Sequence, residues 1–167
     1  LLARQTRLTF QRCGIIDPVS LKDDEATGGM CGPRRAPAMP APQIIDEVTP
    51  CGLRGRGGAG FPTAIQWTTV ADAPGPQKYI VCNADEGDSG AVVDWMLMEG
   101  APYSLIEGMV IAGLATGADE GFIYLRSEYP DAAAALTQAL ASARAAGLLG
   151  ASVLGDPRGF GIELRMG

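Results

Sequence analysis

Histidine is absent from the sequence, and no two of its cysteines stand close enough to form a metal-binding pair. Cys13, Cys31, Cys51 and Cys82 are separated by 18, 20 and 31 residues. Zinc and iron–sulfur sites usually need closely spaced cysteines, or cysteine together with histidine. We therefore expect no metal site within this chain. The cysteines could pair as disulfides, but nothing indicates secretion, and we interpret them as reduced thiols of a cytoplasmic protein.

Long apolar runs and an excess of positive charge are lacking as well. No run approaches the roughly 18 apolar residues of a membrane-spanning helix, so we expect no direct membrane span. The net charge of −6 argues against general nucleic-acid binding. The N-terminus shows neither an initiator Met nor the apolar region of a signal peptide. We interpret the chain as one domain, or one domain with an appendage, truncated from a longer protein.

Glycine, by contrast, is concentrated in one stretch, Gly52 to Trp67, where five of sixteen residues are Gly. Such a cluster suits a loop whose bare N–H groups approach a phosphate closely. Arg54 and Arg56 add positive charge, and Phe61 adds a flat apolar surface. This combination favours a nucleotide or a flavin, and a flexible surface loop is the alternative. The letters GxGxxG fit, but no good strand precedes them, so they do not make a dinucleotide fingerprint by themselves.

A second polar cluster follows a short apolar run. Lys78–Cys82 has the size of a buried parallel strand, and it leads into the acidic residues Asn83–Gly90. Open α/β sheets bind ligands at the carboxyl ends of their strands. The cluster therefore indicates a ligand site, with an ordinary acidic turn as the alternative.

The remainder of the chain alternates between strand-like and helix-like segments. We expect helices at Val92–Glu99, from Pro102 to a C-cap at Gly117, and from Pro130 to Gly147. The expected strands are Lys78–Asn83, Gly121–Arg126 and Gly161–Arg165. This alternation predicts an α/β fold with a parallel sheet and right-handed crossovers.

The N-terminal part has a different composition. We divide the chain into an N-terminal extension and connector, residues 1–50, and a partial binding domain, residues 51–167. Residues 1–12 could form a short basic helix, which we interpret as a solvated face. A turn is expected at Gly14–Pro18, an irregular Gly/Pro-rich connector at Asp23–Pro42, and a short helix at Gln43–Val48.

Four segments together resemble a known family: GLRGRGGAGFPT, KYIVCNADEGDSG, LMEGAPYSLIEGM and EGFIYLRSEYP. The chain is similar to the FMN- and NADH-binding flavoprotein subunit of NADH dehydrogenase complex I and to related hydrogenase diaphorase subunits. The leader RQTRLTFQRCGIIDP is most similar to the beta subunit of soluble NAD-dependent formate dehydrogenase. The resemblance implies a Rossmann-like three-layer fold. It also implies hydride exchange between NAD(H) and FMN, electron transfer to iron–sulfur clusters, and partner subunits of a multi-subunit dehydrogenase.

The resemblance also implies roles for individual residues. Asn83, Asp85 and Glu86 would bind the flavin, Asp88 would lie near the ribose or nicotinamide of NADH, and Phe61 would stack on NADH. The loop beside FMN and the dinucleotide would consist of Gly55, Arg56, Gly57, Gly58, Ala59 and Gly60. No catalytic side chain is expected, because hydride transfer between two rings needs positioning rather than a side-chain acid.

Some departures from the family pattern weaken the implied activity. Gln66 stands where the family usually has the Lys that faces the FMN phosphate, and Trp95 stands where Arg is common. The family's later Gly-Glu-Glu flavin motif and its four cluster-binding cysteines are expected beyond residue 167, so an iron–sulfur cluster belongs to that missing part. The alternatives are a catalytically silent remnant that serves as an assembly or interaction module and a stand-alone nucleotide-binding module.

Overall fold

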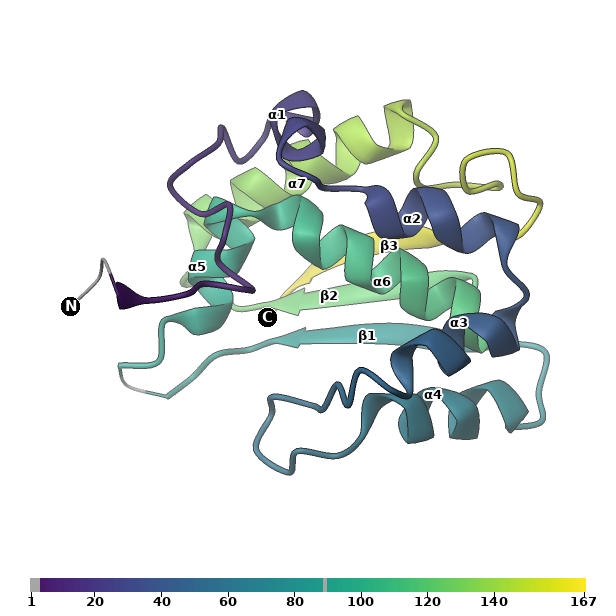
Figure 1. The fold of residues 1–167 in the computed structure, drawn as a ribbon. Helices are drawn as coiled ribbons and strands as arrows, with labels where there is room; N and C mark the ends of the chain where they lie inside the picture. The colour runs from purple at the N-terminus through teal and green to yellow at the C-terminus, as the bar shows by residue number, and fades with distance from the viewer. Residues whose placement is uncertain (1–3, 89) are drawn as a thin grey trace.

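A three-stranded parallel sheet is the centre of the fold (Figure 1). The computed structural model describes residues 4–88 and 90–167. Strand β1 is Tyr79–Ala84, β2 is Glu120–Leu125 and β3 is Gly161–Met166, and β2 lies between the other two. The three predicted strands and their parallel arrangement are confirmed, with ends that shift by one residue.

The crossovers between strands are helical, as expected. Helices α5 (Val93–Gly100) and α6 (Pro102–Thr116) connect β1 to β2, and α7 (Pro130–Ala145) connects β2 to β3. Proline stands in the first turn of α6 and of α7, where its missing N–H costs nothing. Gly117 ends α6 with φ 77°, the left-handed conformation that favours glycine. Because both crossovers run in the same direction across the sheet, right-handed connections place α6 and α7 on the same face.

The main core lies between this helical layer and the sheet. Phe160, just before β3, is fully buried there. A Cβ atom added to Gly113 of α6 would lie 2.6 Å from the Phe160 ring, and one added to Gly121 of β2 would lie 2.8 Å from it. Glycine at these two positions therefore lets the helix and the strand close around one aromatic ring.

The other face of the sheet is open among the described residues. Its side chains include Tyr79, Val81 and Tyr124, which are 51%, 64% and 45% exposed. The rings of Tyr79 and Phe122 lie 5.8 Å apart on this face. The described residues thus supply two layers of the expected three-layer fold, the sheet and the helices on one side of it.

The expectation of an irregular connector over Asp23–Pro42 is wrong. This part of the chain contains α1 (Leu21–Ala26), α2 (Cys31–Arg35) and the 3₁₀ helix η2 (Ala36–Ala38). Its prolines fall near helix beginnings, where they are tolerated, and the Ser20 side chain caps α1 by accepting from the Asp23 N–H at 3.2 Å. Helix α3 (Ala41–Val48) confirms the short helix predicted at Gln43–Val48. Helix α4 (Thr63–Asp72) was not predicted.

The basic helix suggested for residues 1–12 is not formed over the described residues 5–12, which are turns, bends and irregular chain. Arg12 is only 7% exposed, so it does not belong to a solvated face. The turn expected at Gly14–Pro18 is present, with the Ile15 N–H donating to the Arg12 carbonyl at 3.0 Å.

The N-terminal helices share the core of the sheet domain. Met30, Ile44 and Ile45 belong to the same cluster of buried apolar residues as Phe160. The division into residues 1–50 and 51–167 stays a prediction. Among the described residues, no helix is both long enough and apolar enough to cross a membrane.

Candidate functional site

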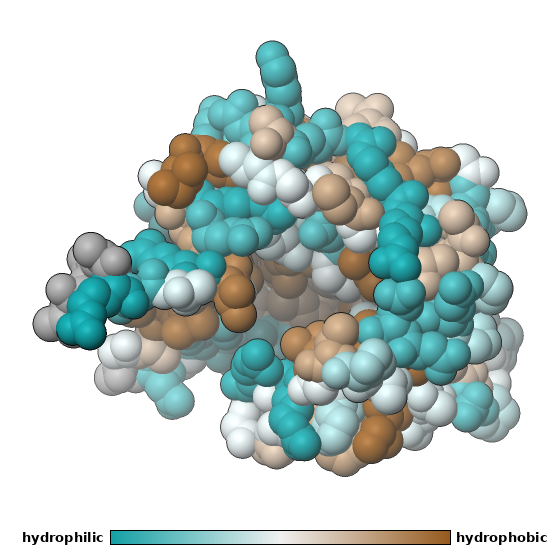
Figure 2. Space-filling model, viewed as in Figure 1, coloured by the Kyte–Doolittle hydropathy of each residue, from teal (hydrophilic) through white to brown (hydrophobic). Residues whose placement is uncertain are grey.

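A cavity of about 800 Å³ lies at the carboxyl end of β1, where the predicted site was expected. The Gly-rich loop contributes Arg56, Gly57 and Gly58, and the segment after β1 contributes Asp85–Asp88. The face drawn in Figure 2 is hollowed between the N-terminal segment and the body of the molecule. The cavity volume of about 800 Å³ suits a ligand as large as a nucleotide, because ligand pockets commonly have volumes of about 300–1,000 Å³. The two predicted motifs therefore share one cavity.

The Gly-rich loop is closed by its own main chain. The Gly55 N–H donates to the Phe61 carbonyl at 2.9 Å, and the Thr63 N–H donates to the Leu53 carbonyl at 2.9 Å. Gly58 has φ 113°, a value that side-chain-bearing residues rarely adopt. Among the described residues, no acceptor takes the N–H groups of Gly57 and Gly58. Gly57, Gly58 and Arg56 line the cavity, and Arg56 Nη1 donates to the Arg54 carbonyl within the loop at 2.7 Å.

The acidic segment after β1 is held by side chains from the next strand end. The Asp85 N–H donates to Asn83 Oδ1 at 3.1 Å, which shapes the turn. Arg126 follows β2, and its Nε lies 3.4 Å from Asp85 Oδ1. The Tyr129 hydroxyl donates to the Glu86 carbonyl at 2.6 Å. Arg126 and Tyr129 therefore hold this turn close to the carboxyl end of β2.

The Glu86 carboxylate is occupied by a helix end. Its oxygens accept from the N–H groups of Val93, Asp94 and Trp95 at 3.0–3.3 Å. This contact satisfies the first free donors of α5 and places a negative charge at the positive end of the helix dipole. Glu86 therefore orients α5 at the cavity wall in addition to lining the cavity.

Asp94 enters the same wall from the first turn of α5. Partial removal from water, and then the nearby negative charge of Glu86, raise the pKa of the Asp94 carboxyl. The cavity lining thus includes the acidic residues Asp85, Glu86, Asp88 and Asp94 together with the basic Arg56. The arrangement suits a ligand that carries both hydroxyl groups and a phosphate.

The structure brings together half of the twelve predicted site residues. Those that line the cavity are Arg56, Gly57, Gly58, Asp85, Glu86 and Asp88. Those that do not line it are Gly55, Ala59, Gly60, Phe61, Gln66 and Asn83. Phe61 is 51% exposed at the base of the loop, and Gln66 lies on an exposed part of α4. The ligand roles of all twelve residues stay predictions.

Several residues of the cavity were not predicted. Sequence adjacency to the NADEGD segment could have indicated Gly87 and Ala91, and the α5 periodicity could have indicated Val93, Asp94 and Leu97. Thr9 and Phe10 also line the cavity, although they lie more than forty residues before the Gly-rich loop. No local pattern marks these two residues, because only the tertiary fold places them there.

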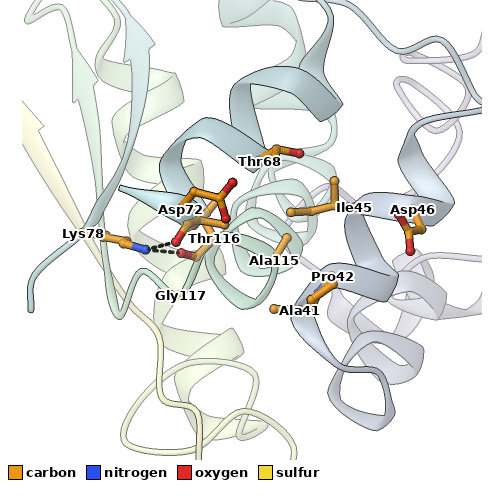
Figure 3. A pocket seen from close by; sticks show the side chains of 11 residues that line it. Ala41, Pro42, Ile45, Asp46, Thr68, Asp72, Lys78, Ala115, Thr116 and Gly117 are labelled. Atoms are coloured by element: carbon orange, nitrogen blue, oxygen red, sulfur yellow. Dashed lines mark hydrogen bonds between the residues drawn. The ribbon is translucent and has the colours of Figure 1, made fainter. Parts of the chain in front are cut away.

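A separate cavity of about 470 Å³ lies at the opposite edge of the sheet (Figure 3). Lys78, just before β1, donates to the carbonyl oxygens of Ala71 at 2.6 Å and Thr116 at 3.3 Å. These carbonyls end α4 and α6, so the ammonium group neutralises the negative ends of two helix dipoles. None of the predicted site residues lines this cavity, and we interpret Lys78 as structural.

Comparisons with known proteins show the family to which the chain belongs. Residues 48–166 match the family model of the Nuo51 FMN-binding domain. The NADP-reducing hydrogenase subunit HndC of Solidesulfovibrio fructosivorans is 44% identical over 98% of this chain and 33% of its own length. An NADH-quinone oxidoreductase subunit of Escherichia coli (strain K12) is 42% identical over 88% of this chain and 33% of its own length.

A solved structure is also similar to this chain. The crystal structure of NAD⁺-reducing [NiFe]-hydrogenase in the H₂-reduced state matches 79% of this chain with a TM-score of 0.62 and 38% identity. The match covers 22% of that chain. The present chain therefore spans about a third of the length of the curated relatives, and less of the solved one.

Proposed function

Because the chain belongs to the family of the Nuo51 FMN-binding domain, we propose that it forms the FMN- and NAD(H)-binding part of an NADH dehydrogenase-type flavoprotein subunit. The observation that carries this proposal is the single cavity shared by the Gly-rich loop and the acidic turn after β1. Its place at the carboxyl edge of a parallel sheet is the usual ligand position in open α/β folds.

The residues of the cavity fit the FMN molecule. The free N–H groups of Gly57 and Gly58 and the Arg56 side chain offer donors to a phosphate. Asp85 and Asp88, which line the same cavity, offer acceptors to ribityl hydroxyls and ring N–H groups. Gln66 supplies no positive charge, so Arg56 is the cation that we assign to the phosphate.

The chemistry that FMN supplies when bound is the acceptance of hydride from NADH and the release of electrons one at a time. The residues of this chain bind and orient the ligands. Arg126 and Tyr129 hold the acidic turn, and Glu86 holds α5, so contacts within the chain fix the cavity wall. This preorganisation lowers the cost of placing two rings against each other.

The finer parts of the assignment are also proposals. Iron–sulfur clusters as electron acceptors, other dehydrogenase subunits as partners and a cytoplasmic location all follow from the family resemblance. The link to NAD-dependent formate dehydrogenase rests on the leader sequence, residues 4–18. Copurification of the chain with a formate-oxidising or a hydrogen-oxidising subunit would decide between these partners.

A silent assembly module is the second candidate, because Gln66 and the occupied Glu86 carboxylate both reduce the groups available to a flavin. Flavin binding separates the two candidates. The first expects FMN to bind at least weakly at the shared cavity, whereas the second expects no binding above that of an unrelated protein.

We expect Arg56→Gln to weaken FMN binding about tenfold while leaving riboflavin binding unchanged, since only FMN carries a phosphate. Equilibrium titration of both flavins measures this. Arg35→Gln is the matched control, because Arg35 is an exposed arginine paired with Glu47 and does not line the cavity. Equal losses for both flavins would contradict the role of Arg56, and no FMN binding by the unmodified chain would favour the silent module.

A further inference from the structure

The N-terminal segment is anchored by a buried charge pair. Arg12 and Asp24 are 7% and 0% exposed, and the Arg12 guanidinium lies 3.4 Å from Asp24 Oδ1. The same guanidinium donates to Ser104 Oγ at 2.9 Å, at the start of α6. Removing a guanidinium and a carboxylate from water is costly unless they stay together. The pair therefore fixes Arg12 between α1 and α6.

A second anchor lies one residue further along. Cys13 Sγ lies 3.9 Å from the Met96 carbonyl of α5. A Cβ atom added to Gly100, at the end of α5, would lie 3.0 Å from Cys13 Sγ. The Cys13 N–H donates to the Phe10 carbonyl at 3.2 Å, so the turn between the two residues is closed. Figure 1 shows the N-terminal segment passing beside α5.

These anchors place Phe10 at the cavity. Phe10 is half-buried and, with Thr9, lines the cavity that the Gly-rich loop and the acidic turn also line. The other residues of this wall are mainly acidic or small. Among the described residues of this cavity, Phe10 is the one aromatic side chain. A planar ring system in the cavity would therefore find its aromatic partner in the N-terminal segment.

We propose that Phe10 is a ligand-contacting residue of the site, which packs against the planar ring of a bound flavin or nucleotide, and that Arg12 positions it. This inference rests on the proposed function, because it names the ligand class of the same cavity. If Phe10 contacts the ligand, the N-terminal segment is part of the binding site and not only an extension of the domain. Aromatic contact with a base or flavin ring commonly changes affinity by about tenfold.

The test compares a ligand that has the ring with one that lacks it. FMN and ribitol 5-phosphate share the sugar chain and the phosphate, and only FMN has the ring. We expect Phe10→Ala to weaken FMN binding about tenfold and to leave ribitol 5-phosphate binding unchanged, with Phe10→Tyr close to the unmodified chain. Leu8→Ala is the control, because Leu8 is an apolar residue of the same segment that is 80% exposed and does not line the cavity.

The outcomes separate the role of Phe10 from the proposed function. FMN binding that Phe10→Ala and Leu8→Ala change equally would overturn the role of Phe10 and leave the proposed function intact. Equal losses of FMN and ribitol 5-phosphate would also overturn it, because a ring contact cannot affect a ringless ligand. Absence of FMN binding by the unmodified chain would overturn both proposals. Amide hydrogen exchange tests the anchor separately: Cys13 and Ile15 should exchange more slowly than an unstructured peptide, and exchange at the unstructured rate would overturn the positioning by Arg12.

Discussion

The Cys82 thiol shows how one position in the fold changes the chemistry of a residue. Cys82 lies in β1, and burial, followed by the negative charge of Asp94, raises its pKa to about 11. At pH 8 a thiol with that pKa is ionised to about one part in a thousand, against about a quarter for an ordinary thiol. Because the thiolate is the nucleophile, Cys82 should react slowly although it is not fully buried.

We expect iodoacetamide at pH 8 to alkylate Cys82 at least tenfold more slowly than the exposed Cys31 and Cys51. Mass spectrometry of the native protein over time measures the three rates. The Cys82 rate should keep rising up to about pH 11. A plateau below pH 9 would contradict the raised pKa.

The raised pKa of Cys82 also affects stability. The Cys82 thiol ionises at a lower pH in the unfolded chain than in the folded protein, so its ionisation should lower the free energy of unfolding as pH rises from about 8.5 toward 11.

The sequence predicted the place of some residues at the cavity and not of others. Arg56 and Asp85 were predictable because charge and glycine density mark a ligand loop and a strand end. Glu86 was expected to face a ligand, but three free N–H groups of α5 compete for the same carboxylate. Phe10 could not be predicted, since its place depends on a buried pair between Arg12 and Asp24 that no local pattern reveals.

At the scale of elements, α6 contains two glycines with opposite roles. Gly113 faces the Phe160 ring, and a Cβ atom there would lie 2.6 Å from it. Gly108 is exposed, and nothing lies within 4 Å of an added Cβ atom. The first glycine is required by packing, whereas the second only lowers helix propensity.

We expect Gly113→Ala to destabilise the protein by about 1–3 kcal/mol through overpacking. Gly108→Ala, in the same helix, should stabilise it by about 0.5–1 kcal/mol because alanine favours the helix. Urea denaturation gives both free energies of unfolding. Stabilisation by both substitutions would mean that α6 and Phe160 do not approach as closely as the structure indicates.

Helices and strands were predicted correctly where a local sequence pattern determines them. Strands β1 and β2 were predictable as short, mainly apolar runs next to charged residues, and β3 as an alternation of apolar and charged residues that begins at glycine. Helices α1 and α2 were not predicted because a high density of Gly and Pro favours irregular structure, although Pro33 and Pro37 stand near helix beginnings. Helix α4 was missed because its β-branched residues and its place after the Gly-rich loop favour other structures.

At the scale of the whole molecule, the helices of the crossovers lie on one face of the sheet, and the order of the strands requires this. A sheet that grows in one direction by right-handed crossovers receives all its helices on the same side. The sequence predicted the parallel sheet and the crossovers. It could not predict the open face, because exposed residues such as Val81 and Tyr124 look in the sequence like buried strand residues.

The open sheet face affects the heat capacity of unfolding. That quantity grows with the apolar area that is newly exposed to water on unfolding, and Tyr79, Val81 and Tyr124 are already largely hydrated in the native state. A typical protein of 167 residues would show about 2–2.5 kcal/mol/K. We expect calorimetry to give a value below this range and a correspondingly flatter stability curve, with less loss of stability on cooling. A value inside the range would show that another surface covers this face in solution.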